Sequence, residues 1–122
     1  MSSDSAGADE EVLVVEEQGM PVIRCIQRLD ATTSPALEQV LLDLLHAGSS
    51  KMVLDFSHVV YLSSAGMRVL LSLTKKCCAA GGGLYICSLG EEVAYIIEMA
   101  GLQEVMQLFG SQEEAIAKAA EL

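Results

Sequence analysis

Two adjacent serines, Ser63 and Ser64, are the residues of this sequence whose type and position best suit chemistry. They come directly before a stretch with helical periodicity, so we expect them at the start of a helix. A hydroxyl there lies beside N–H groups without intrahelical partners and at the positive end of the helix dipole, which stabilises an attached phosphate by about 0.3–1 kcal/mol. Arg68, one turn further on, could pair with that phosphate. Ordinary N-capping is the other interpretation, and spacing alone does not separate the two.

The surroundings of the serine pair do not favour catalysis. A serine hydrolase carries its nucleophile on a G-x-S-x-G turn, and the turn from Leu62 to Gly66 lacks the first glycine. His58 would have to be the general base, although a solvated loop histidine is the simpler interpretation. The glycine run at 81–83 follows a helix and precedes a strand, the reverse of the order that a phosphate-binding loop needs. We therefore predict that the chain is not an enzyme.

The four cysteines do not form a metal or redox motif. Cys25 and Cys87 lie in apolar, strand-like runs, and Cys77 and Cys78 lie together on a helical stretch. None forms a C-x-x-C pair, so the ligand spacing of a zinc site is missing. We expect small, buried, reduced thiols, and we predict no metal and no cofactor.

The composition indicates one small acidic domain. The chain has 122 residues and a formal net charge of -10, so it can bury one core and is repelled by nucleic acids and anionic membrane surfaces. We expect a disordered acidic tail over residues 1–11 and one domain over residues 12–122. The sequence shows no signal peptide and no apolar run that would span a bilayer, so we predict a cytoplasmic protein without nucleic-acid or membrane partners.

Short apolar runs predict the strands. The first two flank a polar, glycine-containing connection and predict a hairpin. The next two do not alternate with polar residues, which is typical of strands buried on both faces. These four runs cover residues 12–15, 20–26, 52–54 and 84–87. A fifth run, at 105–109, is either a short edge strand or a helical turn.

Four helices are predicted between and after these strands. The first has Ser34 as its N-cap and ends at Gly48, and the second begins at the serine pair. Capping-box spacing at Ser88–Glu91 and Ser111–Glu114 predicts the starts of the other two. The alternation of strands and helices predicts an α/β fold with parallel strands, in which the helices pack against the sheet.

The second predicted helix has a basic face. Arg68, Lys75 and Lys76 are three of the seven basic residues, and all lie opposite its apolar face. In an otherwise acidic chain they form a positive strip that could steer an acidic partner. A solvated helix face is the alternative interpretation.

The segments around the serine pair resemble a STAS domain. The resemblance is carried by residues 52–57, Met-Val-Leu-Asp-Phe-Ser, and residues 61–71, Tyr-Leu-Ser-Ser-Ala-Gly-Met-Arg-Val-Leu-Leu. It continues over nearly the whole chain after the tail, through Gly82–Leu84, Ala100–Leu102, Phe109 and Glu113–Ala115. The family includes the anti-sigma factor antagonists and cytoplasmic domains of sulfate transporters.

The resemblance implies a STAS-like α/β fold with a single mixed sheet of four or five strands and about four helices packed mainly on one side. It also implies an anti-sigma factor antagonist of a partner-switching pathway that controls sigma-factor-dependent transcription. In bacterial members an anti-sigma factor serine/threonine kinase, with a histidine-kinase-like ATPase fold, phosphorylates a serine at the start of the second helix. The unphosphorylated form binds that kinase and frees the sigma factor. A metal-dependent PP2C-type phosphatase removes the phosphate from the serine.

Matched residue by residue, the phosphorylated serine falls on Ser64, with Ser63 as the alternative acceptor. Ser63 stands where many members carry Asp, and Arg68 stands where the best-known antagonists carry glycine. The partner contacts implied by the resemblance are made by Ser63, Ser64, Ala65, Gly66, Met67, Arg68 and Lys75. We expect a monomer or weak dimer. The alternative hypothesis is a STAS module that is never phosphorylated and acts as a scaffold or binds a small ligand in a larger signalling assembly.

Overall fold

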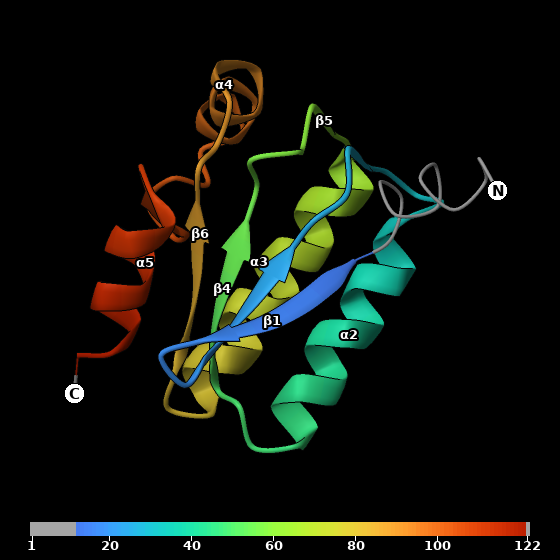
Figure 1. Cartoon of the computed structure of the whole chain (residues 1–122). Coiled ribbons are helices and arrows are strands. Elements are labelled where there is room, and N and C mark those ends of the chain that lie inside the picture. Colours follow the sequence, from blue (N-terminus) through green and yellow to red (C-terminus); the bar gives the residue numbers. More distant parts are fainter. Residues whose placement is uncertain (1–11, 122) are drawn as a thin grey trace, which may run out of the picture.

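A mixed five-stranded sheet with helices on both faces forms the molecule (Figure 1). The computed structural model describes residues 12–121, so the predicted tail at 1–11 lies outside the described residues. The strand order in this sheet is β1-β2-β4-β6-β7. Its strands are β1 (Leu13–Glu17), β2 (Met20–Arg24), β4 (Lys51–Asp55), β6 (Gly83–Cys87) and β7 (Gln107–Phe109). The predicted α/β class and the number of strands are confirmed.

Pairing in the sheet follows from the connections between strands. β1 and β2 form the predicted antiparallel hairpin, and Gln18 and Gly19 at its tip both have positive φ, as a tight two-residue hairpin turn requires. β2, β4, β6 and β7 pair in parallel because each step crosses over through helical segments. Their carboxyl ends therefore meet at one edge of the sheet, where the segments before α3 and α4 begin.

The helices are unequally divided between the two faces of the sheet. The larger core lies on one face, under helices α2 (Ser34–His46), α3 (Ser64–Ala79) and α4 (Glu91–Met99). The other face is covered by α5 (Gln112–Ala119), which packs Ala115, Ile116 and Ala119 on Val22 and Val53. The predicted placement of the helices mainly on one side is confirmed. None of the helices within residues 12–121 is long and apolar enough to cross a membrane.

A second, two-stranded sheet was not predicted. β3 (Arg28–Leu29) pairs in parallel with β5 (Tyr61–Leu62), and no strand was predicted at either segment. Runs of two residues are too short to show the periodicity by which a strand is recognised in a sequence. This small sheet leads directly into the start of α3.

Two predicted helix starts are wrong. The N-cap of α2 is Thr33, and Ser34 lies inside the first turn, because its N–H already donates to the carbonyl of Asp30 (2.8 Å). Ser88 does not open α4: its N–H donates to the Phe109 carbonyl (3.1 Å), which ties it to β7, and Gly90 is the N-cap. Ser111 does cap α5, since its hydroxyl accepts from the Glu114 N–H (3.1 Å).

Candidate functional site

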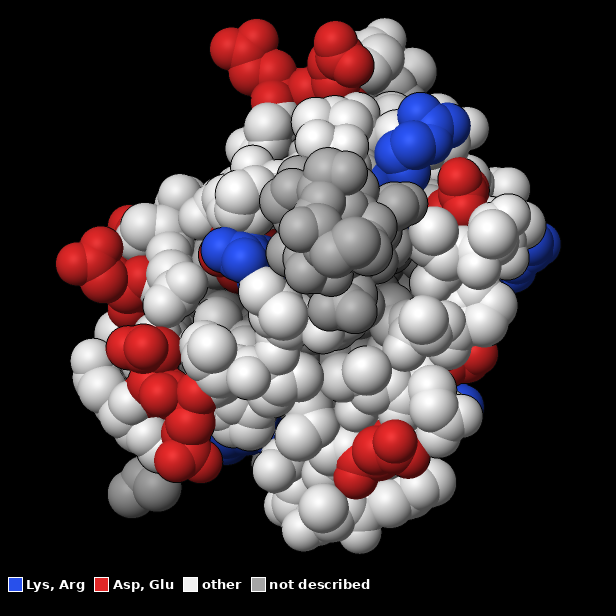
Figure 2. Space-filling view, turned by 45° about the vertical axis from the view of Figure 1, so that its right-hand side comes forward, with Lys and Arg blue, Asp and Glu red and all other residues white. Residues whose placement is uncertain are grey.

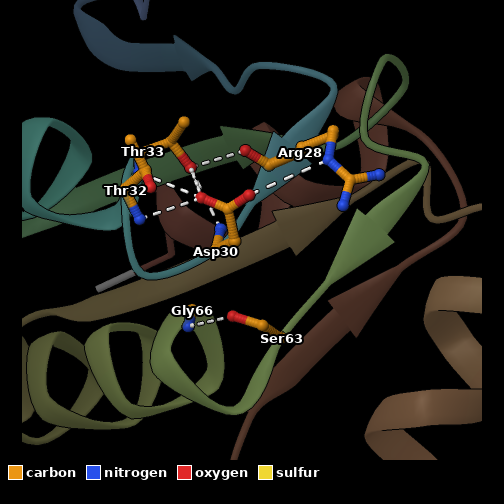
Figure 3. Close-up of polar contacts among 6 residues, drawn as sticks. All are labelled: Arg28, Asp30, Thr32, Thr33, Ser63 and Gly66. Carbon is orange, nitrogen blue, oxygen red and sulfur yellow. Dashed lines mark hydrogen bonds and ion pairs between the residues drawn. The ribbon is translucent and has the colours of Figure 1, made fainter.

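The two serines at the start of α3 have different surroundings. Ser63 is the N-cap, half-buried, and its Oγ accepts a hydrogen bond from the Gly66 N–H (3.3 Å; Figure 3). Ser64 is the first residue of the helix, and its side chain is exposed. Its hydroxyl makes none of the hydrogen bonds found among residues 12–121. The accessible hydroxyl of the pair therefore belongs to Ser64.

The start of α3 is fixed against the small sheet. The Ser63 N–H donates to the Leu29 carbonyl of β3 (2.9 Å). Gly66 is buried at the same contact: a Cβ at this position would lie 2.8 Å from the Leu29 carbonyl oxygen and 2.8 Å from a methyl carbon of Leu62. A side chain at residue 66 would thus push the helix away from β3. The glycine is required for the position of the serines.

Ser64, Arg68 and Lys75 form one exposed line along α3. They are four and eleven residues apart, close to whole numbers of turns at 3.6 residues per turn, and all three are exposed. Ala65 and Met67 beside this line are half-buried, and Met67 packs against the main core. The predicted contact residues therefore divide into an exposed line and a supporting layer, with Gly66 beneath it.

The exposed face of α3 is basic within an acidic molecule. The helix contains Arg68, Lys75 and Lys76 and no acidic residue. The ion pairs found among residues 12–121 involve other cations, and Lys76 donates to the Ser72 hydroxyl (3.3 Å). Figure 2, which views the molecule from another side, shows that basic side chains are few and separate there, whereas acidic side chains gather into patches. The three cations of α3 are thus available to an acidic ligand.

Sequence reasoning missed a polar cluster beside the serines. One carboxylate oxygen of Asp30 accepts from the N–H groups of Thr32 and Thr33 (3.0 and 3.1 Å), and the Thr33 hydroxyl donates to the Arg28 carbonyl (2.6 Å; Figure 3). The hydrogen bond from the Thr33 N–H is the main reason why the pKa of Asp30 is lowered, and those from Thr32 and the nearby Arg28 act in the same direction. This cluster fixes the turn between β3 and α2.

The Arg28 side chain joins the two strands of the small sheet. Its guanidinium lies over the Tyr61 ring, 4.4 Å from the ring centroid, and its Nε lies 3.8 Å from an Asp30 carboxylate oxygen. Asp30 and Thr33 have turn-forming spacing that could have been recognised in the sequence. The Arg28–Tyr61 contact could not, because it depends on the parallel pairing of β3 with β5.

The cysteines require one correction. Cys25, Cys77 and Cys87 are buried as predicted, but Cys78 is exposed. Cys78 follows Lys75 by three residues, so it lies on the outer side of α3, and Cys77 faces the core. Burial raises the pKa of the Cys77 thiol to about 11, and the neighbouring Cys78 adds to the shift. No cluster of three metal-ligating side chains occurs in the described part of the chain.

The hydrolase interpretation, with His58 as general base, lacks the hydrogen bond that it needs. His58 is exposed in the segment before β5, and none of the hydrogen bonds among residues 12–121 joins it to Ser63 or Ser64. A hydrolase needs a base within hydrogen-bond reach of its nucleophile. The arrangement at the start of α3 instead presents one free hydroxyl beside a basic helix face.

Comparisons with known proteins agree with this architecture. The STAS domain family model matches residues 11–115. A Bordetella bronchiseptica protein that bears the name anti-sigma factor antagonist BtrV is 31% identical over 79% of this chain and 84% of its own length. The crystal structure of an anti-sigma factor antagonist from Mycobacterium paratuberculosis superimposes with a TM-score of 0.82. The match covers 91% of this chain and 94% of that chain, with 24% sequence identity.

A third comparison concerns a modified protein. The Bacillus cell fate determinant SpoIIAA in its phosphorylated form has a TM-score of 0.68 to this chain, with 17% identity over 88% of this chain and 98% of that one. At this identity the likeness shows the fold. The family-model match, the BtrV relative and the fold lead to the same assignment: this chain belongs to the STAS domain family.

Proposed function

We propose that this STAS domain is an anti-sigma factor antagonist whose docking to its partner is switched by phosphorylation of Ser64. The observation that carries the proposal is the exposed Ser64 hydroxyl in the first turn of a capped 16-residue helix. The names of the relatives support the class of function, since they are anti-sigma factor antagonists. The proposed partner is an anti-sigma factor that is also a serine/threonine kinase of the histidine-kinase-like ATPase fold, and the proposed compartment is the cytoplasm.

The structure favours Ser64 over Ser63 as the acceptor. The Ser63 oxygen is occupied by the Gly66 N–H and lies half-buried, so its transfer to a kinase site would require the helix start to open. In the proposed reaction the Ser64 oxygen forms a bond to the γ-phosphorus of ATP, the bond to the bridging oxygen breaks, and ADP leaves. The hydroxyl proton passes to a base of the kinase.

A phosphate on Ser64 would keep the helix and change the surface. The positive end of the helix dipole stabilises such an anion by about 0.3–1 kcal/mol. Arg68, one turn away on the same exposed line, can pair with it. The phosphate adds about -1.5 to -2 charge units to a surface that is otherwise basic, and a partner that docks on this surface would have to desolvate it. The expected consequence is release of the partner.

The contact surface in this proposal is the exposed line of α3, Ser64, Arg68 and Lys75, with Ser63, Ala65, Gly66 and Met67 as its supporting layer. A PP2C-type phosphatase would restore binding by hydrolysing the phosphoserine with water. The non-phosphorylated scaffold remains the alternative function, and substitutions at residue 64 distinguish the two.

The test is to incubate the chain with an anti-sigma factor kinase from its own organism and ATP–Mg²⁺. We expect the intact mass to rise by one phosphoryl group in the wild type and not in Ser64→Ala. We also expect Ser64→Asp to weaken binding to the kinase by about tenfold or more, whereas Ser64→Ala binds like the wild type. Ser57→Ala, at another exposed serine, is the matched control and should still be phosphorylated.

Two outcomes would contradict this proposal. The absence of a mass shift in a wild type that binds the kinase, with Ser64→Asp binding equally well, would favour the scaffold. A mass shift that persists in Ser64→Ala and is lost in Ser63→Ala would transfer the switch to Ser63.

A further inference from the structure

The helix that begins at Ser64 and the next helix along the chain carry charges of opposite sign. Residues 56–90 contain three basic residues and no acidic one, and all three lie on α3. Residues 77–117 contain six acidic residues and no lysine or arginine. Three of those six, Glu91, Glu92 and Glu98, lie on α4. The two helices at this part of the molecule therefore carry opposite charge.

Two adjoining hollows lie against the acidic helix. One, of about 330 Å³, is lined by Val59, Val60 and the first residues of α4. The other is a shallow depression, widely open to solvent, on the surface of α4 at Glu91, Glu92, Tyr95 and Ile96. Both share Glu91 and Glu92, so they form one surface, which we call the α4 groove (Val59, Val60, Glu91, Glu92, Tyr95 and Ile96).

The α4 groove has exposed apolar side chains at its margins. Val60 is 59% exposed, Tyr95 61% and Met99 67%. Tyr95 and Met99 follow Glu91 at intervals of one turn, so they continue the outer face of α4. Large apolar side chains beside carboxylates and without a basic residue among the lining residues fit a ligand that is both apolar and positively charged.

The groove is continuous with the switch. Val59 and Val60 directly precede β5, whose last residue, Leu62, is followed by Ser63 and Ser64. α4 also contacts β5, and Figure 1 places α4 and β5 at the same end of the sheet. A protein that docks at Ser64 therefore has the groove within its footprint, since a stable interface covers about 800 Å² on each partner.

We propose that the α4 groove binds a basic amphipathic segment of the anti-sigma factor, with a large apolar side chain between Val60 and Tyr95 and lysine or arginine beside Glu91 and Glu92. The inference rests on the proposed function and specifies its partner. The partner must present basic groups to α4 and acidic groups to α3, so the charge division fixes the orientation of the complex. Ser64 lies on the basic side of this division, where a phosphate would repel the partner's acidic groups.

A second copy of the chain fits the groove less well. It would have to present its α3, the helix with three basic residues, to the α4 groove of the first copy. Two such contacts, α3 of each copy on α4 of the other, could form in one twofold dimer. Each copy, however, brings a net charge of -10, which opposes the association.

The experiment measures binding kinetics of the full chain to the purified anti-sigma factor at two ionic strengths. Glu92→Lys should slow association by about tenfold at low salt, and the effect should shrink as salt screens the charges. Glu113→Lys is the matched control, because Glu113 is also the second residue of a short helix and lies on α5, against the other face of the sheet. Glu92→Gln gives the same direction with a smaller effect and a lower risk to folding.

The apolar part of the groove is tested by Tyr95→Ser. Loss of this anchor should raise the Kd by about thirtyfold, through faster dissociation. Val15→Ser, at an exposed valine of β1, is the control and should change the Kd by less than about twofold. Circular dichroism melts establish that each variant is folded before its binding is compared.

The outcomes separate this inference from the function on which it rests. If Glu92→Lys and Tyr95→Ser bind like the wild type while Ser64→Asp does not bind, the groove inference is wrong and the proposed function stands. If the wild type does not bind the anti-sigma factor, both are wrong. Self-association of the wild type at micromolar concentration in sedimentation experiments, abolished by Glu92→Lys, would assign the groove to a second copy and overturn the inference.

Discussion

Ser63 and Ser64 show how one residue of offset separates structure from function at the start of a helix. Ser63 has extended backbone angles, and its oxygen meets the Gly66 N–H, so its hydroxyl belongs to the helix cap. Ser64 is already helical, which turns its side chain outward. The same logic applies to Cys77 and Cys78, where one residue of offset separates a buried thiol from an exposed one.

The thiols provide a prediction at this scale. We expect iodoacetamide at pH 8 to alkylate Cys78 rapidly and the three buried cysteines slowly, because the thiolate is the reactive form and burial raises the pKa of the other thiols. Cys77, whose pKa is about 11, should gain reactivity as the pH rises towards that value in the folded protein. Peptide mass mapping with time measures this. Rapid alkylation that survives Cys78→Ser would disprove the assignment.

At the scale of elements, the contact between α3 and the small sheet positions the two serines. β5 leads into the helix, β3 supplies the Leu29 carbonyl that accepts from Ser63, and Gly66 lets the helix approach that carbonyl closely. A side chain at residue 66 would meet backbone, which cannot rotate away as a side chain can. The geometry of the serines therefore depends on a glycine in the first turn of α3.

We predict that Gly66→Ala destabilises the protein. Overpacking of this kind costs about 1–3 kcal/mol, and the better helix propensity of alanine returns at most about 1 kcal/mol, so a net loss of about 1–2 kcal/mol is expected in urea unfolding. Gly90→Ala is the comparison for a change without overpacking: nothing lies within 4 Å of a Cβ there, so its cost is limited to the poorer N-cap that alanine makes. Equal free energies of unfolding for Gly66→Ala and the wild type would contradict this, because they would mean that β3 moves to accommodate the methyl group without a loss of stability.

At the scale of the molecule, helices bury both faces of the sheet: α2, α3 and α4 cover one face and α5 covers the other. β6 is buried along its whole length because α3 and α5 cover it from opposite sides. α5 contributes small side chains, Ala115 and Ala119, and one larger one, Ile116, to the second core. The site at the start of α3 lies on the other layer, so the second core supports the sheet without forming part of the contact surface.

This separation predicts a variant that loses stability and keeps binding. Ile116→Ala should lower the free energy of unfolding by about 2–3 kcal/mol, since it removes a buried side chain at the edge of the second core. Binding to the anti-sigma factor under conditions where the variant is folded should be unchanged. Val105→Ala, at an exposed valine, is the stability control. A loss of affinity in folded Ile116→Ala would indicate coupling between the two layers.

The sequence by itself determined the class of fold and the serine pair at which the switch is proposed. The strands, the hairpin and the alternation with helices are local patterns, because a strand buried on both faces and a helix with one apolar face each have a characteristic spacing of apolar residues. The helix start at the serine pair is equally local, since capping depends on neighbouring residues. The STAS resemblance rests on the same segments and added the proposed phosphorylation.

Tertiary structure alone decided which side chains meet. The turn at Ser88 differs from prediction because the carbonyl of Phe109, which belongs to β7, accepts its N–H. The cap at Thr33 differs for a local reason, since the carbonyl of Asp30 already accepts the N–H of Ser34. The Arg28–Tyr61 contact, the close approach of Gly66 to β3 and the α4 groove each join segments more than about twenty residues apart. Such contacts depend on strand pairing and packing, which leave no periodic signal in a sequence.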